Sequence, residues 1–300
     1  MATIYPVDIP GSVAARSAEP MVHRLSFADL YDALRRGWED FKAVPSHAIM
    51  LCVIYPVLGL ALARLVLGYS VLPLLFPLAA GFALIGPFAA LGLYEMSRRR
   101  ETGEDISAWH AFDMLRSPSF GAMLGLGAIL LAIFVVWIAT AQAIYVSAFG
   151  YAPAAAIPDF ATRVLTTPEG WMLIVVGCGV GLLFAIAALC ISAVSFPMML
   201  DRQAGIAEAI ATSLRVAARN PLQIGAWGLI VAALLVLGSL PAFLGLAVVV
   251  PLLGHATWHL YRRAVEPSAS GPRTRPSRRI RRSAADFPAT LLQWKPRNEV

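Results

Sequence analysis

Long apolar segments alternate with short polar stretches along the chain. The last apolar segment, 222–260, is about twice as long as a bilayer of roughly 30 Å requires at 1.5 Å per residue. Gly238 and Pro241 lie in its middle, and this combination is typical of a tight turn, so we divide the segment into two helices. The pattern predicts an all-α polytopic membrane protein with six transmembrane helices, at about 46–67, 71–96, 119–149, 171–200, 222–239 and 242–260.

The composition agrees with this pattern and excludes several classes of protein. Apolar residues make up 58% of the chain and charged residues only 14%, whereas soluble domains contain about 45–50% and about 25%. We therefore exclude an ordinary cytosolic enzyme, a secreted disulfide scaffold and a disordered chain. The first residues contain no apolar stretch long enough for a signal peptide, so we expect none.

The positions of the basic residues predict the orientation. Of the 24 Lys and Arg, 22 fall before the first predicted span, after the sixth, or in the loops after the second and fourth. Only Arg64 and Arg163 fall on the other side. Because basic residues in short loops stay cytoplasmic, we expect a multi-pass protein of a bacterial inner (plasma) membrane with both termini in the cytoplasm.

A similar segment precedes each predicted pair of spans, at 26–42, 105–116 and 205–219. Ser26 and Asp29 have the spacing of a capping box at the start of the first segment. We predict an internal repeat of three hairpins, each preceded by an amphipathic helix that lies in the inner membrane interface. The alternative is an inner loop that contains a helix. The apolar positions are Phe27, Leu30, Tyr31, Leu34, Trp38 and Phe41 in the first segment, Trp109 and Phe112 in the second, and Ile206, Ile210 and Leu214 in the third.

The two ends of the chain differ from its middle. We predict a flexible cytoplasmic N-terminal arm (1–24), a six-helix transmembrane domain (25–265) and a disordered, Arg-rich cytoplasmic tail (266–300). The arginines of the tail favour contact with anionic lipids, at about 1 kcal/mol per basic residue. We expect the lipid bilayer, and a membrane-protein partner or a second copy of the chain, as partners. We expect no binding of nucleic acid, because no folded nucleic-acid-binding domain is predicted beside the arginines.

Polar residues gather at the predicted inner ends of the spans. We call Glu95, Asp201, His255, His259 and Tyr261 the polar inner rim. His255 and His259 are four residues apart and share a helix face, so they could bind haem or a metal ion if another ligand, such as His47, lay at the same depth.

The alternative for these histidines is an aromatic interfacial belt, since Trp258 lies between them. We therefore assign no cofactor and no metal site, and we expect replacement of both histidines by Phe to leave the fold intact. No catalytic residue is assigned either, because the chain has no nucleophile elbow and no phosphate loop. Whether it is an enzyme stays open, with a non-enzymatic role favoured.

Several strings resemble an integral membrane family of bacteria, the domain of unknown function 2189. They include Arg36-Gly37-Trp38-x-Asp40-Phe41, Pro197-Met198-Met199-Leu200-Asp201-Arg202 and Leu253-Gly254-His255-Ala256-Thr257-Trp258-His259. The resemblance covers roughly 25–266 and implies an inner-membrane protein without an established activity. Some relatives carry the label of a cytochrome c oxidase subunit. The haem-copper catalytic subunit that this label suggests needs more spans and more buried histidines than this chain offers.

Three functions remain compatible with the sequence. The leading one is a non-enzymatic permeation, transport or scaffold unit of the membrane. The first alternative is a small haem- or metal-associated subunit of a respiratory, cytochrome oxidase-like assembly. The second alternative is a lipid-contact or membrane-organising protein.

Overall fold

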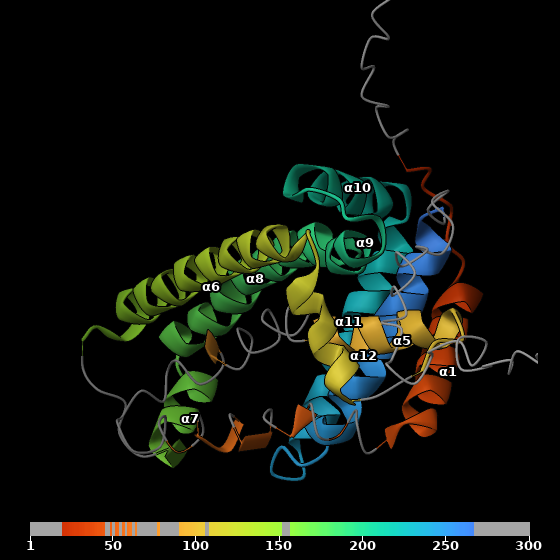
Figure 1. Cartoon of the computed structure of the whole chain (residues 1–300). Coiled ribbons are helices and arrows are strands. Elements are labelled where there is room, and N and C mark those ends of the chain that lie inside the picture. Colours follow the sequence, from red (N-terminus) through yellow and green to blue (C-terminus); the bar gives the residue numbers. More distant parts are fainter. Residues whose placement is uncertain are drawn as a thin grey trace, which may run out of the picture. The chain divides into compact units, whose positions relative to one another are not determined.

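Helices are the only regular elements in the part of the chain that the computed structural model describes, which is residues 20–45, 49, 52–53, 56–57, 59–61, 64, 77–78, 90–105, 108–151 and 157–266 (Figure 1). The all-α prediction is therefore confirmed for these residues. Most of the first predicted hairpin (46–67 and 71–96), the N-terminal arm and nearly all of the tail lie outside the described residues. The number of six spans and their arrangement in hairpins thus stay predictions.

The described helices follow one another along the chain in the following order. They are α1 (Phe27–Ala43), α5 (Leu91–Glu101), the 3₁₀ helix η2 (Ala108–Arg116), α6 (Phe120–Phe149), α7 (Ile157–Thr166), α8 (Pro168–Ser192), α9 (Ser195–Arg202), α10 (Ile206–Arg219), α11 (Pro221–Ser239) and α12 (Leu246–Ala264).

Three of the described helices are long and apolar enough to cross a membrane. They are Phe120–Phe149, Pro168–Arg202 (α8 continued by α9) and Pro221–Ser239, and they agree with the third, fourth and fifth predicted spans. The sixth predicted span forms α12, which does not qualify, because its C-terminal half carries His255, His259 and two arginines. The predicted turn between the last two helices is present at 240–245.

The start of α1 follows from its first residues. The side chain of Ser26 accepts a hydrogen bond from the backbone N–H of Asp29, and the Asp29 side chain accepts one from the backbone N–H of Ser26. This is the predicted capping box, and it satisfies N–H groups that the first turn of a helix leaves without partners. Leu25 and Leu30 beside it are buried.

Helix α1 lies antiparallel to the C-terminal half of α12 (Figure 1). Val22 and Val265 form an antiparallel backbone bridge, and the N–H of His23 donates to the carbonyl of Ala264 at 2.8 Å. Further along, a Cβ at Gly37 would lie 2.6 Å from the backbone nitrogen of Ala256. The two backbones approach so closely here that only glycine fits at position 37 without a shift of either helix.

The face of α1 that packs on the protein contains only part of the predicted apolar stripe. Leu30 and Phe41 are buried, whereas Phe27, Tyr31 and Trp38 are 60%, 70% and 43% exposed. The close approach to α12 requires small residues in the middle of the packing face, at Ala33 and Gly37, and the exposed rings of Phe27, Tyr31 and Trp38 lie on another side of the helix.

The other two repeated segments are also helical. The second is a 3₁₀ helix, η2, rather than an α-helix, and the third is α10. In α10 the packing face again consists of small side chains, while Leu214 of the predicted stripe is 45% exposed.

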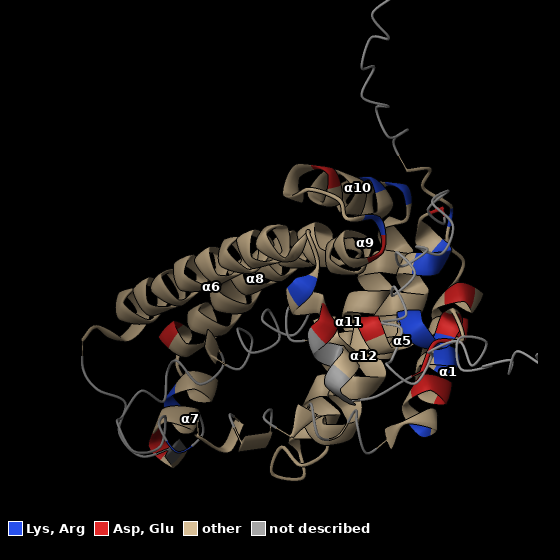
Figure 2. Cartoon of the chain, viewed as in Figure 1, with Lys and Arg blue, Asp and Glu red and all other residues tan. Residues whose placement is uncertain are grey.

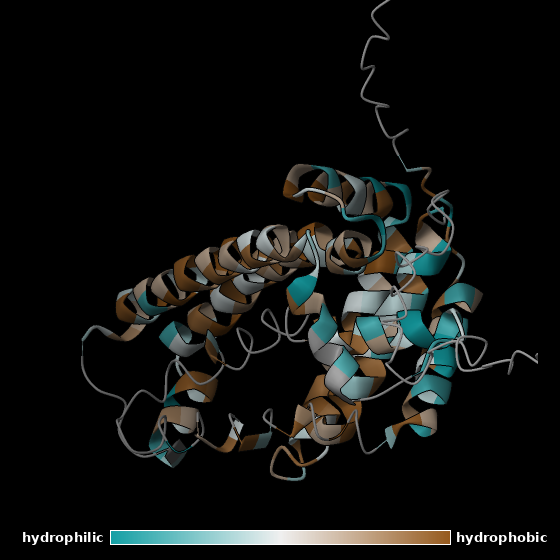
Figure 3. Ribbon diagram, in the orientation of Figure 1, coloured by the Kyte–Doolittle hydropathy of each residue, from teal (hydrophilic) through white to brown (hydrophobic). Residues whose placement is uncertain are grey.

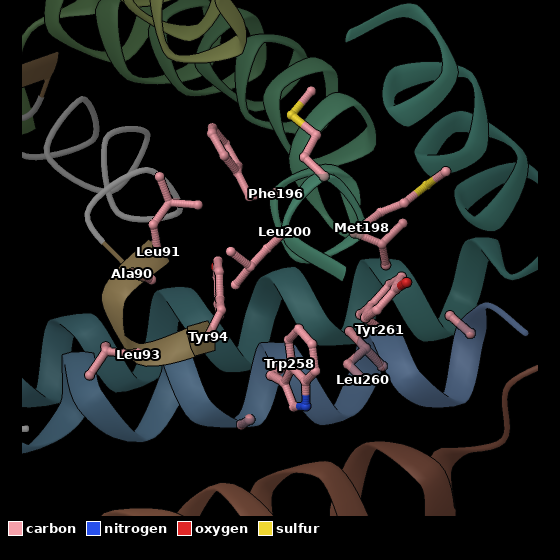
Figure 4. Close-up of a cluster of buried hydrophobic side chains, with 14 of the residues drawn as sticks. Ala90, Leu91, Leu93, Tyr94, Phe196, Met198, Leu200, Trp258, Leu260 and Tyr261 are labelled. Atoms are coloured by element: carbon pink, nitrogen blue, oxygen red, sulfur yellow. The ribbon is translucent and has the colours of Figure 1, made fainter. Parts of the chain in front are cut away.

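The hydrophobic core of the described residues lies where α5, α9 and α12 meet. Tyr94, Phe196, Trp258 and Tyr261 are among its largest fully buried side chains (Figure 4). Helices α6 and α8 contact each other and expose much of their apolar surface (Figure 3). The apolar residues are therefore divided between a buried core and an exposed, membrane-compatible surface.

Candidate functional site

The buried polar residues lie around the C-terminal half of α12. This half of the helix places His255, Trp258 and Tyr261 at 0% exposure. Small residues make this burial possible: a Cβ at Gly254 would lie 2.4 Å from the Leu93 side chain of α5. Charged residues of α1 and α5 are brought to the same region (Figure 2).

The first group, which we call the Asp40 cluster, joins three helices that are distant in sequence. The Ser97 hydroxyl donates to Oδ2 of Asp40 at 2.6 Å, and Nε2 of His259 lies 2.9 Å from the same oxygen. Nη1 of Arg100 donates to Oδ1 of Asp40 at 2.6 Å. Nδ1 of His255 lies 2.8 Å from the Ser97 oxygen.

The protonation of this cluster follows from its hydrogen bonds. Burial of Asp40 works to raise its pKa, but the hydrogen bonds from His259 and Ser97 outweigh burial and hold the pKa below its ordinary value. Asp40 is thus a carboxylate that accepts. Because the single hydroxyl hydrogen of Ser97 is donated to Asp40, Nδ1 of His255 must carry the hydrogen of its bond to Ser97.

The remaining nitrogen of His255 is buried as well. Nε2 has no hydrogen-bond partner among the described residues. The chain from His255 through Ser97 and Asp40 to His259 is therefore a continuous hydrogen-bonded path, with its buried end at His255 and its partly accessible end at His259.

A second group, the Asp201 cluster, lies on the same half of α12. The Tyr261 hydroxyl donates to Oδ2 of Asp201 at 2.7 Å, and burial raises the pKa of Tyr261, so this hydroxyl stays protonated. Arg262 contacts Asp201 at 3.4 Å and Glu101 at 3.1 Å. The indole N–H of Trp258 donates to Glu101 at 3.1 Å. These contacts attach α12 to both α9 and α5.

A third group, the Glu95 cluster, attaches α5 to η2. Glu95 is 4% exposed and accepts from Arg98 and Arg99. The hydrogen bond to Glu95 raises the pKa of Arg98. Arg99, which is 3% exposed, also reaches Asp113 of η2 at 2.5 Å. Arg98 and Arg99 together offset the charges of the two carboxylates, Glu95 and Asp113.

The five residues of the predicted polar inner rim are distributed over the three clusters. His255 and His259 meet in the Asp40 cluster, Asp201 and Tyr261 meet in the Asp201 cluster, and Glu95 belongs to the third. His47, the speculative further ligand, lies outside the described residues.

The sequence interpretation missed Asp40, Ser97, Arg99, Arg100 and Glu101. Asp40 gave one usable signal. It follows Ala33 by seven residues and Gly37 by three, so the three residues share one face of the helix. A carboxylate on a face of small residues indicates a buried partner on the opposing helix. No comparable signal marked Ser97.

The histidines belong to no metal-binding group in the described part of the chain. No group of three or more His, Cys, Asp or Glu there has an arrangement that could hold a metal ion. Both histidines are hydrogen-bonded, so they are partners in a buried network. We therefore replace the expectation drawn from sequence: substitution of both by Phe should destabilise the fold, because Ser97 and Asp40 would each lose one hydrogen-bond partner.

Comparison with known proteins gives a family for part of the chain. Residues 75–201 match the model of a family described as a predicted integral membrane protein, the domain of unknown function 2189. This confirms the predicted resemblance over the matched range, which contains Ser97 and Asp201 but neither Asp40 nor α12. No curated protein and no solved structure matches the chain. The match and the three apolar helices identify an integral membrane protein.

Proposed function

We propose that this integral membrane protein is a non-enzymatic scaffold, whose paired charges fix a helical core and whose apolar helices contact other membrane components. One observation carries the proposal. The ranges 120–149, 170–200 and 221–239 contain no Asp, Glu, Lys or Arg, while α8 exposes Val175, Leu182 and Leu183 at 66%, 59% and 67%. Such surfaces are suited to lipid or to a neighbouring transmembrane helix.

The pairing of the polar groups favours a scaffold over a permeation unit. A path for ions needs polar or charged groups along the membrane-spanning segments. Here the charged side chains of the three clusters bond to one another and attach α1, α5, α9, η2 and α12. Their arrangement supports a structural role for the polar inner rim.

Flux measurements separate these two roles. We expect liposomes that contain the purified protein to pass protons, potassium and chloride no faster than empty liposomes. Flux that depends on protein and is lost in Asp40→Asn would contradict the scaffold and restore the permeation unit. A positive test is photo-crosslinking in native membranes from position 183 on α8. We expect adducts with an identified membrane protein or a second copy, and none from the buried position 188 of the same helix.

A haem- or metal-associated subunit is the second candidate. It is favoured by two histidines on one face of α12, with His47 available in the sequence. The test is an ultraviolet-visible spectrum with metal analysis of the purified protein. A Soret band or stoichiometric metal that is lost on replacement of His255 would support this candidate, and their absence from freshly purified protein would remove it.

The location that we propose is a bacterial inner membrane with both termini in the cytoplasm. The one-sided distribution of basic residues supports it. Labelling of single cysteines with a membrane-impermeant reagent in intact cells tests it: we expect position 159 to react and position 39 to stay unlabelled. The reverse pattern would overturn the orientation.

A further inference from the structure

Helix α1 has three different faces. One face packs on α12 and consists of Leu30, Ala33, Gly37, Asp40 and Phe41. A second face is charged and consists of Asp29, Asp32, Arg36 and Glu39. The third, which we call the aromatic stripe, consists of Phe27, Tyr31, Leu34 and Trp38, spaced by four, three and four residues.

The aromatic stripe is exposed because of how α1 packs. At 100° per residue it lies about 90° around the helix from the packing face. The 2.6 Å approach of a Cβ at Gly37 to Ala256 leaves no room for a side chain at position 37, where the two backbones are closest. Tyr31 is 70% exposed, and Trp38 stacks on Phe41 at 5.3 Å between ring centroids.

Helix α10 repeats this arrangement in part: Leu214 of its apolar stripe is 45% exposed, whereas Ile206 and Ile210 pack partly against the core. Its packing face consists of Ala209, Thr212, Ser213, Val216 and Ala217. Its stripe of Ile206, Ile210 and Leu214 lies roughly 100° away, in the same rotational sense as in α1.

The position of each helix in the chain indicates what covers its stripe. Helix α10 ends at Arg219, and the candidate span Pro221–Ser239 begins two residues later. Helix α1 ends at Ala43, three residues before the predicted span 46–67. Three residues extend at most about 11 Å, so the C-terminal end of α1 is within about 11 Å of the first residue of the predicted span. The end of α10 is similarly close to the start of α11.

The chemistry of the stripe fits the headgroup region of a bilayer. Tyr and Trp combine an apolar ring with a polar atom and are enriched at the membrane–water interface. Basic residues border the stripe on its open side: Arg35 and Lys42 lie at its edge, and both are exposed. The ammonium group of Lys42 suits a lipid phosphate, while the guanidinium of Arg35 is paired with Asp32 and Glu39.

We propose that the aromatic stripe of α1 is a lipid-contact surface that inserts into the headgroup region beside the first predicted span. Lipid thereby covers Phe27, Tyr31 and Trp38, while the opposite charged face of α1 stays in water. The proposal goes beyond the scaffold role and does not depend on it, because it concerns only whether lipid or water contacts one face of α1.

Spin labels at single cysteines test the proposal. The starting chain has Cys52, Cys178 and Cys190 replaced by Ala, and the protein is placed in liposomes of phosphatidylethanolamine and phosphatidylglycerol. Labels are attached at Tyr31→Cys on the stripe and at Glu39→Cys on the charged face. The collision rates with oxygen, which concentrates in lipid, and with a water-soluble nickel chelate are then measured.

We expect the ratio of oxygen to nickel collisions to be several-fold higher at position 31 than at position 39. Equal ratios would place the stripe in water and overturn the proposal. Low rates with both reagents at position 31 would show that protein covers it, either a second copy or another segment of this chain, and would also overturn it.

A second site keeps the test valid if the first variant folds poorly. Leu214→Cys replaces the exposed member of the α10 stripe, where the native side chain is 45% exposed, and we expect the same several-fold difference from Glu208→Cys. Thermal unfolding of each labelled protein, compared with the cysteine-free parent, identifies a misfolded variant before its collision rates are interpreted. Failure of the lipid contact leaves the flux and crosslinking results unchanged, so the two proposals are separable.

Discussion

The C-terminal half of α12 and the middle of α8 have opposite relations between polarity and burial. In α12 the polar His255 and Tyr261 are fully buried. In α8 the apolar Leu182 and Leu183 are 59% and 67% exposed. In these two helices, hydropathy therefore does not predict whether a side chain is buried. It predicts what surrounds the side chain: the apolar side chains of α8 face a lipid-like surrounding, and the polar side chains of α12 face polar partners.

This difference has a physical cause on each side. In hydrocarbon no hydrophobic effect drives an exposed leucine inward, because lipid tails are as apolar as the leucine itself. A buried carboxylate or guanidinium, in contrast, must find an opposite charge and hydrogen bonds to offset its lost hydration. The polar clusters around α12 meet that requirement, and they attach helices that are far apart in sequence.

The largest expected effect is the loss of the carboxylate of Asp40. Asp40→Ala leaves Arg100 and His259 without their common partner. Breaking a buried charged group of this kind costs about 3–5 kcal/mol, and we expect the lower end, because Arg100 is 38% exposed. Thermal unfolding in detergent measures it. Glu39→Ala, at an exposed ion pair one residue away, is the matched control and should cost less than about 1 kcal/mol.

A pair of leucine substitutions tests the comparison within the apolar helices. Leu126 of α6 is fully buried, so Leu126→Ala should destabilise the protein by about 2–4 kcal/mol through a cavity. Leu183→Ala removes the same atoms from an exposed position and should change stability by less than about 0.5 kcal/mol. Equal effects on the unfolding temperature would show that α8 is covered by protein.

The close contact between α1 and α12 gives an intermediate effect. Alanine is a better helix former than glycine by about 1 kcal/mol, but a Cβ at Gly37 would clash with the backbone of Ala256. Overpacking costs about 1–3 kcal/mol, so the clash should win and Gly37→Ala should lower the unfolding temperature. Gly225→Ala in α11, where a Cβ meets nothing within 4 Å, should not lower it.

The smallest effect is expected in the Asp201 cluster. Tyr261→Phe removes the hydroxyl that donates to Asp201, while Arg262 remains beside that carboxylate. We expect a loss of about 1 kcal/mol, the ordinary value of one hydrogen bond. Tyr31→Phe, on the exposed stripe, is the control. A loss above that of Asp40→Ala would mean that the Asp201 cluster, and not the Asp40 cluster, holds the core.

Local signals in the sequence predicted much of the helical framework. The capping box at Ser26, the turn after Gly238 and the spans beginning near 119, 171 and 222 are all present in the structure. Each depends on residues only a few positions apart. The orientation of α1 was less accessible, because the close approach of Ala256 on a distant helix decides its buried face, and the face of Ala33, Gly37 and Asp40 is only an indirect signal of that contact.

The site divides in the same way. Spacing along one helix grouped His255 with His259, and this grouping is found in the structure. The residues that hold them, Asp40 and Ser97, come from two other helices, 219 and 158 residues away in the closest pairings. Only the fold places them there, so a list of polar residues at span ends could not identify the carboxylate on which the cluster depends.

The antiparallel pairing of α1 with α12 has a consequence for biosynthesis. Helix α1 is made first and its partner last, with 219 residues between Asp40 and His259. At about 5–20 residues per second, roughly 10–45 s pass before α12 exists. Throughout that time the small-residue face and the carboxylate of α1 lack their final partner. A product truncated before α12 therefore presents an uncovered charge that quality-control proteases can recognise.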